Sequence, residues 1–424
     1  MSRPPRIQFP DPVFIADNEA LAALCSRLAH EPFITIDTEF IRERTYWPEL
    51  CVVQLGGAAD VAVIDAQAEG LDLAPLGALL ANPAVVKVFH AARQDVEIFL
   101  LLFGAPPQPI FDTQVAAMVA GFGDQAGYDA LVSALTGAQI DKSHRFSDWS
   151  ARPLSPSQIS YAAADVTYLR LVYEKLLARL AQEDRGEWVE EEMAALADPG
   201  LYRADPEAMW LKLKLRPGNR RQAGILRAIA AWREREAQRV NIPRGRLLKD
   251  DAIPEIAALA PETPEALARA RGITRGFAEG KSGLSLLAAI AEARALPEEA
   301  LPALPTRAER DGPRPSPALV ALLRVLLTAK SEEHGVAPKL LASSEDIDRL
   351  AAEDAPDVPA AHGWRRRMFG EDAMALKDGR IALATRGKRI RLVPLSESGT
   401  PAAHGAAVPQ EAAPEEAVSE KAGA

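Results

Sequence analysis

Short apolar runs alternate with amphipathic segments through the first 200 residues, and this pattern predicts an α/β domain. Runs rich in Val, Ile and Leu predict strands at 33–40, 51–57, 61–65 and 85–90. Longer segments with helical spacing predict helices at 91–103 and 113–120. Short connections join the first three strands, so we expect an antiparallel meander, and the later, helix-linked strands are expected to add in parallel. The prediction is a mixed sheet flanked by helices.

A further helix is predicted from Pro156 by clear start signals. Ser155 is a suitable N-cap, Pro156 suits the first helical position, and Gln158 completes a capping box. Tyr161 and Asp165 lie one helical turn apart and off the apolar stripe of this helix. We therefore expect these two side chains to face something other than the main core.

The strand pattern stops after the acidic stretch 187–192, and short amphipathic helices broken by proline follow. We predict an α/β domain at 1–200 and a small all-α domain at 206–295. A linker dense in proline and charge covers 296–317. A second small all-α domain is expected at 318–395, where residues 378–395 alternate weakly and form a hairpin or an extended segment. The last stretch, 396–424, is rich in Ala, Glu and Pro and is expected to be disordered.

Composition narrows the class of protein. The chain has 424 residues, 48% hydrophobic and 25% charged, as ordinary globular domains have. Two cysteines give no disulfide framework, and six scattered histidines argue against a zinc site. There is no apolar run long enough for a signal peptide or a membrane span, so we expect a cytoplasmic protein.

Charge is unevenly distributed. The formal net charge of −10 argues against nucleic-acid binding when it is taken alone. However, residues 212–249 contain twelve Lys and Arg against two acids. A solvated helix face is the ordinary interpretation of such a run, but the excess of one sign favours a phosphate-binding surface.

Carboxylates on three separate elements predict a metal site. Asp37 and Glu39 point to the same face of the first predicted strand because side chains alternate along a strand. Asp95 falls in the first turn of a helix, and Asp165 lies beside Tyr161 on the later helix. Each acid alone has a structural explanation, such as a helix-dipole interaction for Asp95. Together they lie near element ends, where the sites of α/β folds occur.

Such a set of residues suits phosphodiester hydrolysis. Two Mg²⁺ or Mn²⁺ ions held by carboxylates activate a water and stabilise the leaving oxyanion. A tyrosine with a pKa of about 10 is a poor base at neutral pH, so Tyr161 is expected to orient the water by a hydrogen bond.

The motifs resemble those of the ribonuclease D family. The segments that carry the resemblance are FITIDTEF at 33–40, RTYWPEL at 44–50, FHAARQDVEIF at 89–99, FDTQ at 111–114 and DWSARPLS through YAAAD at 148–165. The family belongs to the DEDD exonucleases, in the subclass with tyrosine in the third motif, and has a ribonuclease H-like fold. Residues 206–290 resemble the HRDC domain, the helicase-and-RNase-D C-terminal domain. Residues 363–370 resemble the end of a second such domain.

The resemblance implies roles for five residues. Asp37 would bridge both metals, Glu39 and Asp165 would complete the first metal site, and Asp95 would hold the second metal through water. Tyr161 would position the attacking water. The implied activity is metal-dependent 3′–5′ hydrolysis of RNA that releases nucleoside 5′-monophosphates, with trimming of tRNA precursors as the typical role. The family's members look monomeric.

Several other residues are candidates for RNA binding or for structural roles. The RNA-binding candidates are Trp47, Arg152, Lys212, Lys214, Arg220 and Arg221. Trp47 would stack a base or pack in the core, and Arg152 would meet a phosphate or form a salt bridge within the fold. His90 is assigned a structural role because Tyr161 already takes the water-orienting position. Asp112 is expected to cap a helix.

Two alternatives to an exoribonuclease stay open. The same metal chemistry cuts DNA, and the contacts to the 2′-OH that discriminate RNA cannot be located from the sequence. The other alternative is a non-catalytic RNA-binding scaffold, against which the complete set of acids argues.

Overall fold

The computed structural model describes residues 9–141, 143–213, 217–304 and 315–395. Lys214, part of the predicted linker and the predicted tail at 396–424 lie outside the described residues. The chain divides into two compact units, one of residues 1–314 with 335–340 and one of residues 315–334 with 341–424. Each unit is described by itself.

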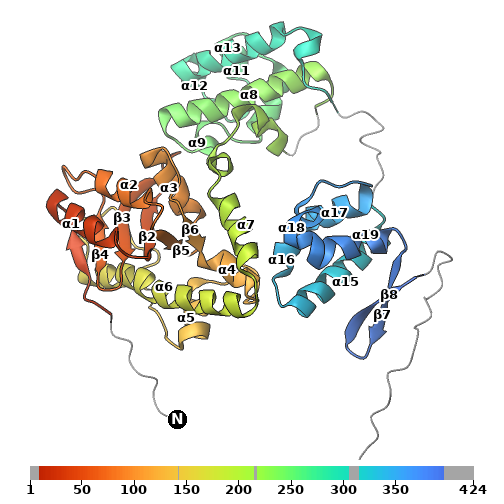
Figure 1. Ribbon diagram of the computed structural model, residues 1–424. Coiled ribbons are helices and arrows are strands. Elements are labelled where there is room, and N and C mark those ends of the chain that lie inside the picture. The colour runs from red at the N-terminus through yellow and green to blue at the C-terminus, as the bar shows by residue number, and fades with distance from the viewer. Residues whose placement is uncertain (1–8, 142, 214–216, 305–314, 396–424) are drawn as a thin grey trace, which may run out of the picture. The chain divides into compact units, whose positions relative to one another are not determined.

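A mixed sheet forms the centre of the first unit (Figure 1). Its strands are β1 (Val13–Ile15), β2 (Phe33–Ile41), β3 (Glu49–Gly56), β4 (Val61–Asp65), β5 (Val86–Phe89) and β6 (Ile110–Asp112). Their order is β1-β4-β3-β2-β5-β6. The pairs β2–β3 and β3–β4 are antiparallel, whereas β2–β5, β5–β6 and β1–β4 are parallel. The predicted meander with parallel additions is therefore confirmed.

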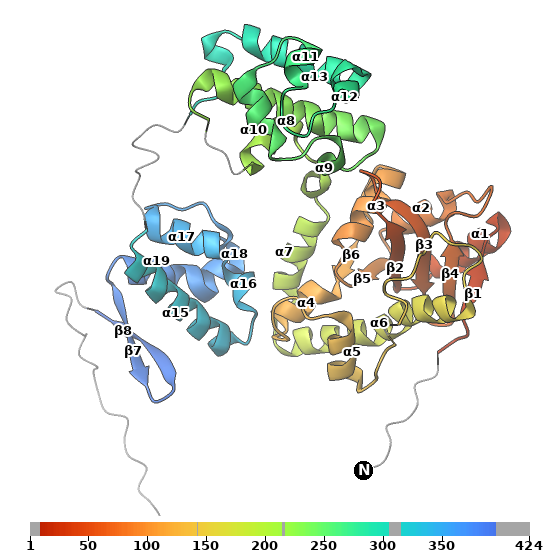
Figure 2. The ribbon, with the colours of Figure 1, turned by 180° about the vertical axis from the view of Figure 1, so that it is seen from behind.

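Helices cover both faces of this sheet (Figures 1 and 2). They are α1 (Asn18–Leu28), α2 (Ala74–Leu80), α3 (Arg93–Phe103), α4 (Thr113–Val119), α5 (Tyr128–Thr136), α6 (Pro156–Gln182) and α7 (Gly186–Leu196). The long helix α6 crosses one face, where the hydroxyl of Thr35 on β2 donates to the carbonyl of Val166 at 2.8 Å. Ser155 and Gln158 form the predicted capping box at its start. This cap fixes where α6 begins and so which residues face β2.

Two strands were missing from the sequence prediction, and one helix began too early. The edge strands β1 and β6 have three residues each, too few for a periodicity signal. The helix predicted from residue 91 begins at Arg93 because Ala91 has a left-handed φ of 60°. The carboxylate of Asp112 accepts hydrogen bonds from the backbone amides of Ala91 and Ala92, at 3.0 and 2.9 Å. It also caps the start of α4. The predicted capping role of Asp112 is confirmed.

A small helical domain completes the first unit. It contains η2 (Pro206–Lys212), α8 (Arg220–Val240), α9 (Arg244–Leu247), α10 (Ala252–Leu259), α11 (Pro264–Leu267), α12 (Arg275–Glu279) and α13 (Lys281–Ala295). Helix α8 supplies Ile225, Leu226 and Ile229 to a core shared with α10 and α13. The helix ends at Asn241, whose left-handed φ of 52° turns the chain into α9.

The second unit is helical with one hairpin. It contains α15 (Pro317–His334), α17 (Ser344–Ala352), α18 (Gly363–Arg365), α19 (Glu371–Lys377), β7 (Ile381–Arg386) and β8 (Arg389–Pro394). Residues 335–340, with most of α16 (Pro338–Leu341), belong to the first unit. The prediction of an all-α domain at 318–395 is therefore incomplete, because β7 and β8 form an antiparallel hairpin. A hairpin was one of the two alternatives predicted for residues 378–395. Trp364 is buried in the core of the second unit. Among the described residues, no helix combines the length and apolarity needed to cross a bilayer.

Candidate active site

Three carboxylates from two elements that are far apart in the sequence meet at one face of β2. Asp37 and Glu39 lie two residues apart on this strand and so project to the same side. Asp165 comes from α6, which packs across that side. One carboxylate oxygen from each residue lies within 4.8 Å of the others. The expected convergence of these three acids is present in the structure.

Asp95 approaches this cluster from the far side of the sheet. It lies in the first turn of α3 and is only 6% exposed. The last residue pair between the parallel strands β2 and β5 is Thr35 with Val88, and β5 ends at Phe89. Strand β2 therefore continues past the end of β5. The hydroxyl of Thr38, the residue between Asp37 and Glu39, donates to the Asp95 carboxylate. Asp95 is therefore held by β2 itself, close enough to Asp37 for the two charges to act on each other.

Burial and mutual repulsion disfavour the ionised form of these carboxyl groups and raise their pKa values. Burial, followed by the charge of Asp165, raises the pKa of Asp37 well above its ordinary value. Burial and the charges of Asp37, Asp165 and Asp95 raise the pKa of Glu39 to about 10. Burial also raises the pKa of Asp165 to about 7, and burial with the charge of Asp37 raises that of Asp95. Cations among these groups would relieve both penalties.

The donor set fits hard divalent cations. All the converging ligands are carboxylate oxygens, which Mg²⁺ and Mn²⁺ prefer, and no thiol or imidazole takes part in this described cluster. Glu39 has no cationic partner among the described residues, and burial together with the anionic charges around it raises its pKa. In the absence of a cation, this arrangement is unfavourable because the carboxylates repel one another.

Tyr161 lies at the edge of the same cluster, as its spacing from Asp165 predicts. Its ring is packed against His144 and Trp149, with centroids 6.1 Å away in each case. Burial and the charges of Asp165, Glu39 and Asp37 raise the pKa of its hydroxyl. The phenol therefore stays protonated at neutral pH and is suited to a hydrogen-bonding role.

A cavity of about 390 Å³ opens over these residues, and several of its lining residues were missed by sequence reasoning. Arg145, from the loop between α5 and α6, brings a positive charge that acts on Tyr161. Tyr128 is half-buried, and its hydroxyl donates to the carbonyl of Ala164 in α6. Neither position belongs to a periodic pattern, so no signal in the sequence marked them.

His90 also lines this cavity. Its Nδ1 lies 3.0 Å from the hydroxyl of Thr113, and its ring packs against Tyr128 at 5.4 Å between centroids. These contacts agree with the structural role predicted for it.

The RNA-binding candidates have varied surroundings. Arg152 makes a two-pronged ion pair with Asp65, at 2.6 and 2.8 Å, and donates to three backbone carbonyls. The salt-bridge alternative is therefore the one the structure supports for Arg152. Arg220 and Arg221 donate to backbone carbonyls between Arg294 and Pro302 and pair with Glu298. Lys212 is exposed, and Trp47 is half-buried.

The basic stretch 212–249 is more neutralised than its composition indicates. Seven of its arginines pair with acids, five of them with Glu207, Asp250 or Glu298 from outside the stretch: Arg220, Arg221, Arg227, Arg233, Arg235, Arg239 and Arg244. The expectation of one uniform phosphate-binding surface on this helix therefore has limited support.

Comparisons with known proteins agree with this geometry. A family model described as 3′-5′ exonuclease matches residues 12–181, and one described as HRDC domain matches residues 222–290. Ribonuclease D of Granulibacter bethesdensis is 68% identical over 393 residues, which are 93% of this chain and 99% of that protein. Ribonuclease D of Bartonella henselae is 41% identical, over 87% of this chain and 90% of that protein.

A solved structure is also similar over most of its length. Escherichia coli RNase D, described as an exoribonuclease involved in structured RNA processing, matches with a TM-score of 0.74 and 30% identity. The match covers 87% of this chain and 99% of that chain. The likeness therefore includes both the sheet domain and most of the helical regions.

Proposed function

The chain belongs to the ribonuclease D family of 3′–5′ exoribonucleases, and we propose that Asp37, Glu39, Asp95, Asp165 and Tyr161 carry out its hydrolysis of RNA. The observation that carries this proposal is the convergence of three carboxylates, with oxygens within 4.8 Å of one another. Asp95 is positioned nearby by the hydrogen bond from Thr38. The products are nucleoside 5′-monophosphates released from the 3′ end.

Each residue has a distinct part in the proposal. Asp37, at the centre of the cluster, would be shared between two cations, with Glu39 and Asp165 on one side and Asp95 on the other. When bound, two Mg²⁺ or Mn²⁺ ions supply an activated water and stabilise the leaving oxyanion. Tyr161 would hold the attacking water by its hydroxyl, whose raised pKa keeps its proton in place.

The test is an assay of one RNA labelled either at its 5′ end or at its 3′ end. With Mg²⁺, the 3′ label is expected to appear at once as a mononucleotide, while the 5′ label shortens one nucleotide at a time. A chelator should stop both reactions. Release of the 5′ label first, or equal rates in chelator, would contradict the proposal.

The natural substrate and setting are further parts of the proposal. We propose tRNA precursors as substrates, a monomeric enzyme and a cytoplasmic location. Comparing rates on RNA and DNA strands of one sequence tests the DNA exonuclease alternative, because the metal chemistry itself serves both polymers. A substrate preference of at least about tenfold for RNA is expected if the 2′-OH is recognised.

A further inference from the structure

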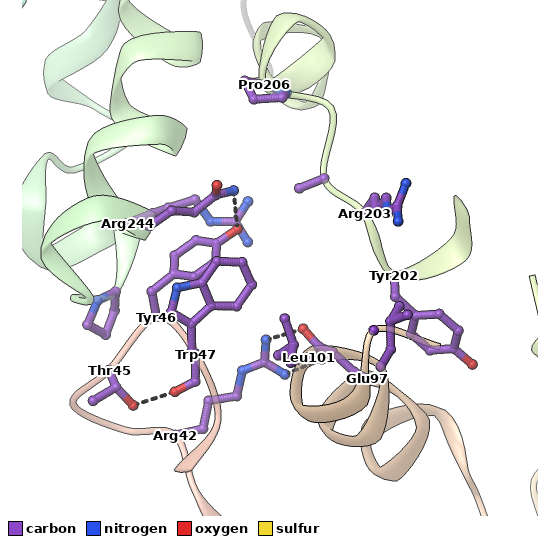
Figure 3. Close-up of a pocket in the computed structure, with 15 residues that line it drawn as sticks. Arg42, Thr45, Tyr46, Trp47, Glu97, Leu101, Tyr202, Arg203, Pro206 and Arg244 are labelled. Atoms are coloured by element: carbon purple, nitrogen blue, oxygen red, sulfur yellow. Dashed lines mark hydrogen bonds and ion pairs between the residues drawn. The ribbon is translucent and has the colours of Figure 1, made fainter. Parts of the chain in front are cut away.

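A second cavity, away from the carboxylate cluster, lies beside the loop that follows β2 (Figure 3). Its volume is about 820 Å³. Trp47 and Arg244 lie on one side, Arg203 lies on the other, and Arg42 with Glu97 lies at its base (Figure 3). It is referred to below as the Trp47 cleft. Its lining mixes aromatic rings with arginines, which is the composition of single-strand binding surfaces.

The position of Trp47 is fixed through its backbone. The side-chain oxygen of Asn241 accepts the amides of Tyr46 and Trp47, at 3.1 and 3.0 Å. The hydroxyl of Tyr46 donates to the buried Glu234 of α8. The rings of Tyr46 and Trp47 pack in a T-shaped arrangement with centroids 4.6 Å apart, and Trp47 stays half-buried at the cleft. A ring held in this way can stack on a base with little loss of conformational freedom.

The charges of the cleft differ in how far they are already neutralised. Arg42 makes two hydrogen bonds to Glu97, at 2.7 and 2.8 Å, and Arg244 pairs with Glu234 at 3.1 Å. Arg203 is exposed and forms no ion pair with any of the described residues. The cleft therefore offers an aromatic face opposite an arginine that is available to an anion. A base joined to a phosphate matches this pair of groups.

The cleft is connected to the catalytic strand. Asp37 and Glu39 lie on β2, and the chain passes from Glu39 to Arg42 in three residues. Three residues of extended chain span roughly 10 Å. The base of the cleft therefore lies next to the end of the strand that carries the two acids.

We propose that the Trp47 cleft binds a nucleotide of single-stranded RNA on the 5′ side of the scissile bond. Its base stacks on Trp47, and its phosphate is bound by Arg203. The inference rests on the proposed function, because the 3′ end must lie at the carboxylates. It assigns this function to the cleft rather than to the basic stretch of α8.

The experiment compares ribo-oligonucleotides of two and six nucleotides. Wild-type protein should show a higher kcat/KM on the hexamer, and Trp47→Leu or Arg203→Ala should reduce that advantage about tenfold by raising KM for the hexamer. Arg203→Ala should also lower the salt dependence of hexamer binding by about 0.7 in slope. Trp47→Phe, which keeps a stacking ring, and Arg203→Lys should restore most of the effect. Arg269→Ala is the control, since Arg269 is exposed and lies outside the cleft lining.

Hexamer binding measured in chelator separates this inference from the proposed function. If the wild type binds the hexamer but does not hydrolyse it with metal, the proposed function fails, while the two cleft variants still test the site. An unchanged hexamer advantage in both variants would overturn the inference. Equal losses on the dimer and the hexamer would overturn it as well, because they would indicate a disturbed catalytic strand.

Discussion

The hydroxyl of Thr38 donates a hydrogen bond to the carboxylate of Asp95. Thr38 points away from Asp37 and Glu39 along β2, so one short segment of strand supplies two acids to one face and positions a third acid from the other. This hydrogen bond positions Asp95, in the first turn of α3, without the help of a bound ion. It also makes Thr38 a positioning residue that the family motif alone does not explain.

We expect Thr38→Val to weaken metal use without unfolding the protein. The change keeps the shape of the side chain and removes the hydrogen bond that stabilises the charged form of Asp95. Loss of such an outer partner typically costs about 10- to 100-fold in metal affinity or activity. Activity measured against Mg²⁺ concentration should show a higher half-saturating concentration. Thr35→Val is the matched control on the same strand, because its hydroxyl donates to the backbone carbonyls of Gly56 and Val166 and not to a carboxylate.

Asp37→Asn is expected to separate stability from activity. Asp37 is half-buried and its carboxylate lies close to that of Asp165, so a neutral amide removes repulsion. We expect the Tm of the chelated protein to rise by about 2–4 °C, and turnover to fall by about a thousandfold or more. Asp65→Asn is the contrast, since that carboxylate is paired with Arg152 and its loss should lower Tm. A lower Tm for Asp37→Asn would contradict the electrostatic account of the site.

The pKa of Glu39 predicts how pH affects the metal-free protein. Its pKa is about 10 in the folded chain and about 4.5 when unperturbed, so between these values the folded chain holds more protons than the unfolded chain. The stability of the metal-free protein therefore falls as pH rises through this window. Asp165 contributes in the same direction up to about pH 7. Divalent cations replace these protons, so their affinity rises with pH.

Thermal unfolding at pH 5 and pH 9, with Mg²⁺ and with chelator, measures this linkage. The increase in Tm caused by Mg²⁺ should be larger at pH 9, and the difference between the two metal conditions cancels titrations elsewhere in the chain. Glu39→Gln should reduce the pH dependence. An equal Mg²⁺ effect at both pH values would contradict the assignment.

The convergence of Asp37, Glu39 and Asp165 could be predicted from the sequence because the position of each residue rests on a strong local rule. Alternation along a strand puts Asp37 beside Glu39, and a capping box fixes the phase of α6 and so the direction of Asp165. These rules need only a few neighbouring residues, and the order of the central strands follows from connection lengths.

The parts that were missed depend on long-range partners. The pairing of Arg220 and Arg221 with Glu298 joins residues more than 70 positions apart, and no periodicity reveals it. The same is true of Arg145, which reaches the site from an irregular loop. Strands of three residues such as β6 are defined by their neighbours and not by their own sequence.

We expect Tyr161→Phe to lower kcat about 100-fold while changing KM little. The substitution removes only the hydroxyl that would hold the attacking water, and the packing of the ring against Trp149 is kept. Steady-state rates on a short RNA at saturating Mg²⁺ give both constants. Tyr173→Phe, in the same helix but packed against Phe33 and Phe111, should have wild-type rates. Equal rates for Tyr161→Phe and wild type would remove Tyr161 from the catalytic set.

Arg152→Ala is expected to lower stability and to leave RNA binding intact. Its guanidinium pairs with Asp65 and donates to the carbonyls of Cys51, Trp149 and Ala151, so it ties β3 and β4 to the loop before α6. Loss of a partly buried, two-pronged pair costs about 2–4 kcal/mol of unfolding free energy, measurable by urea denaturation. Asp65→Asn should cost a similar amount, and the double variant little more, because the two residues share one interaction. A raised KM with unchanged unfolding free energy would instead return Arg152 to the phosphate-binding role first considered for it.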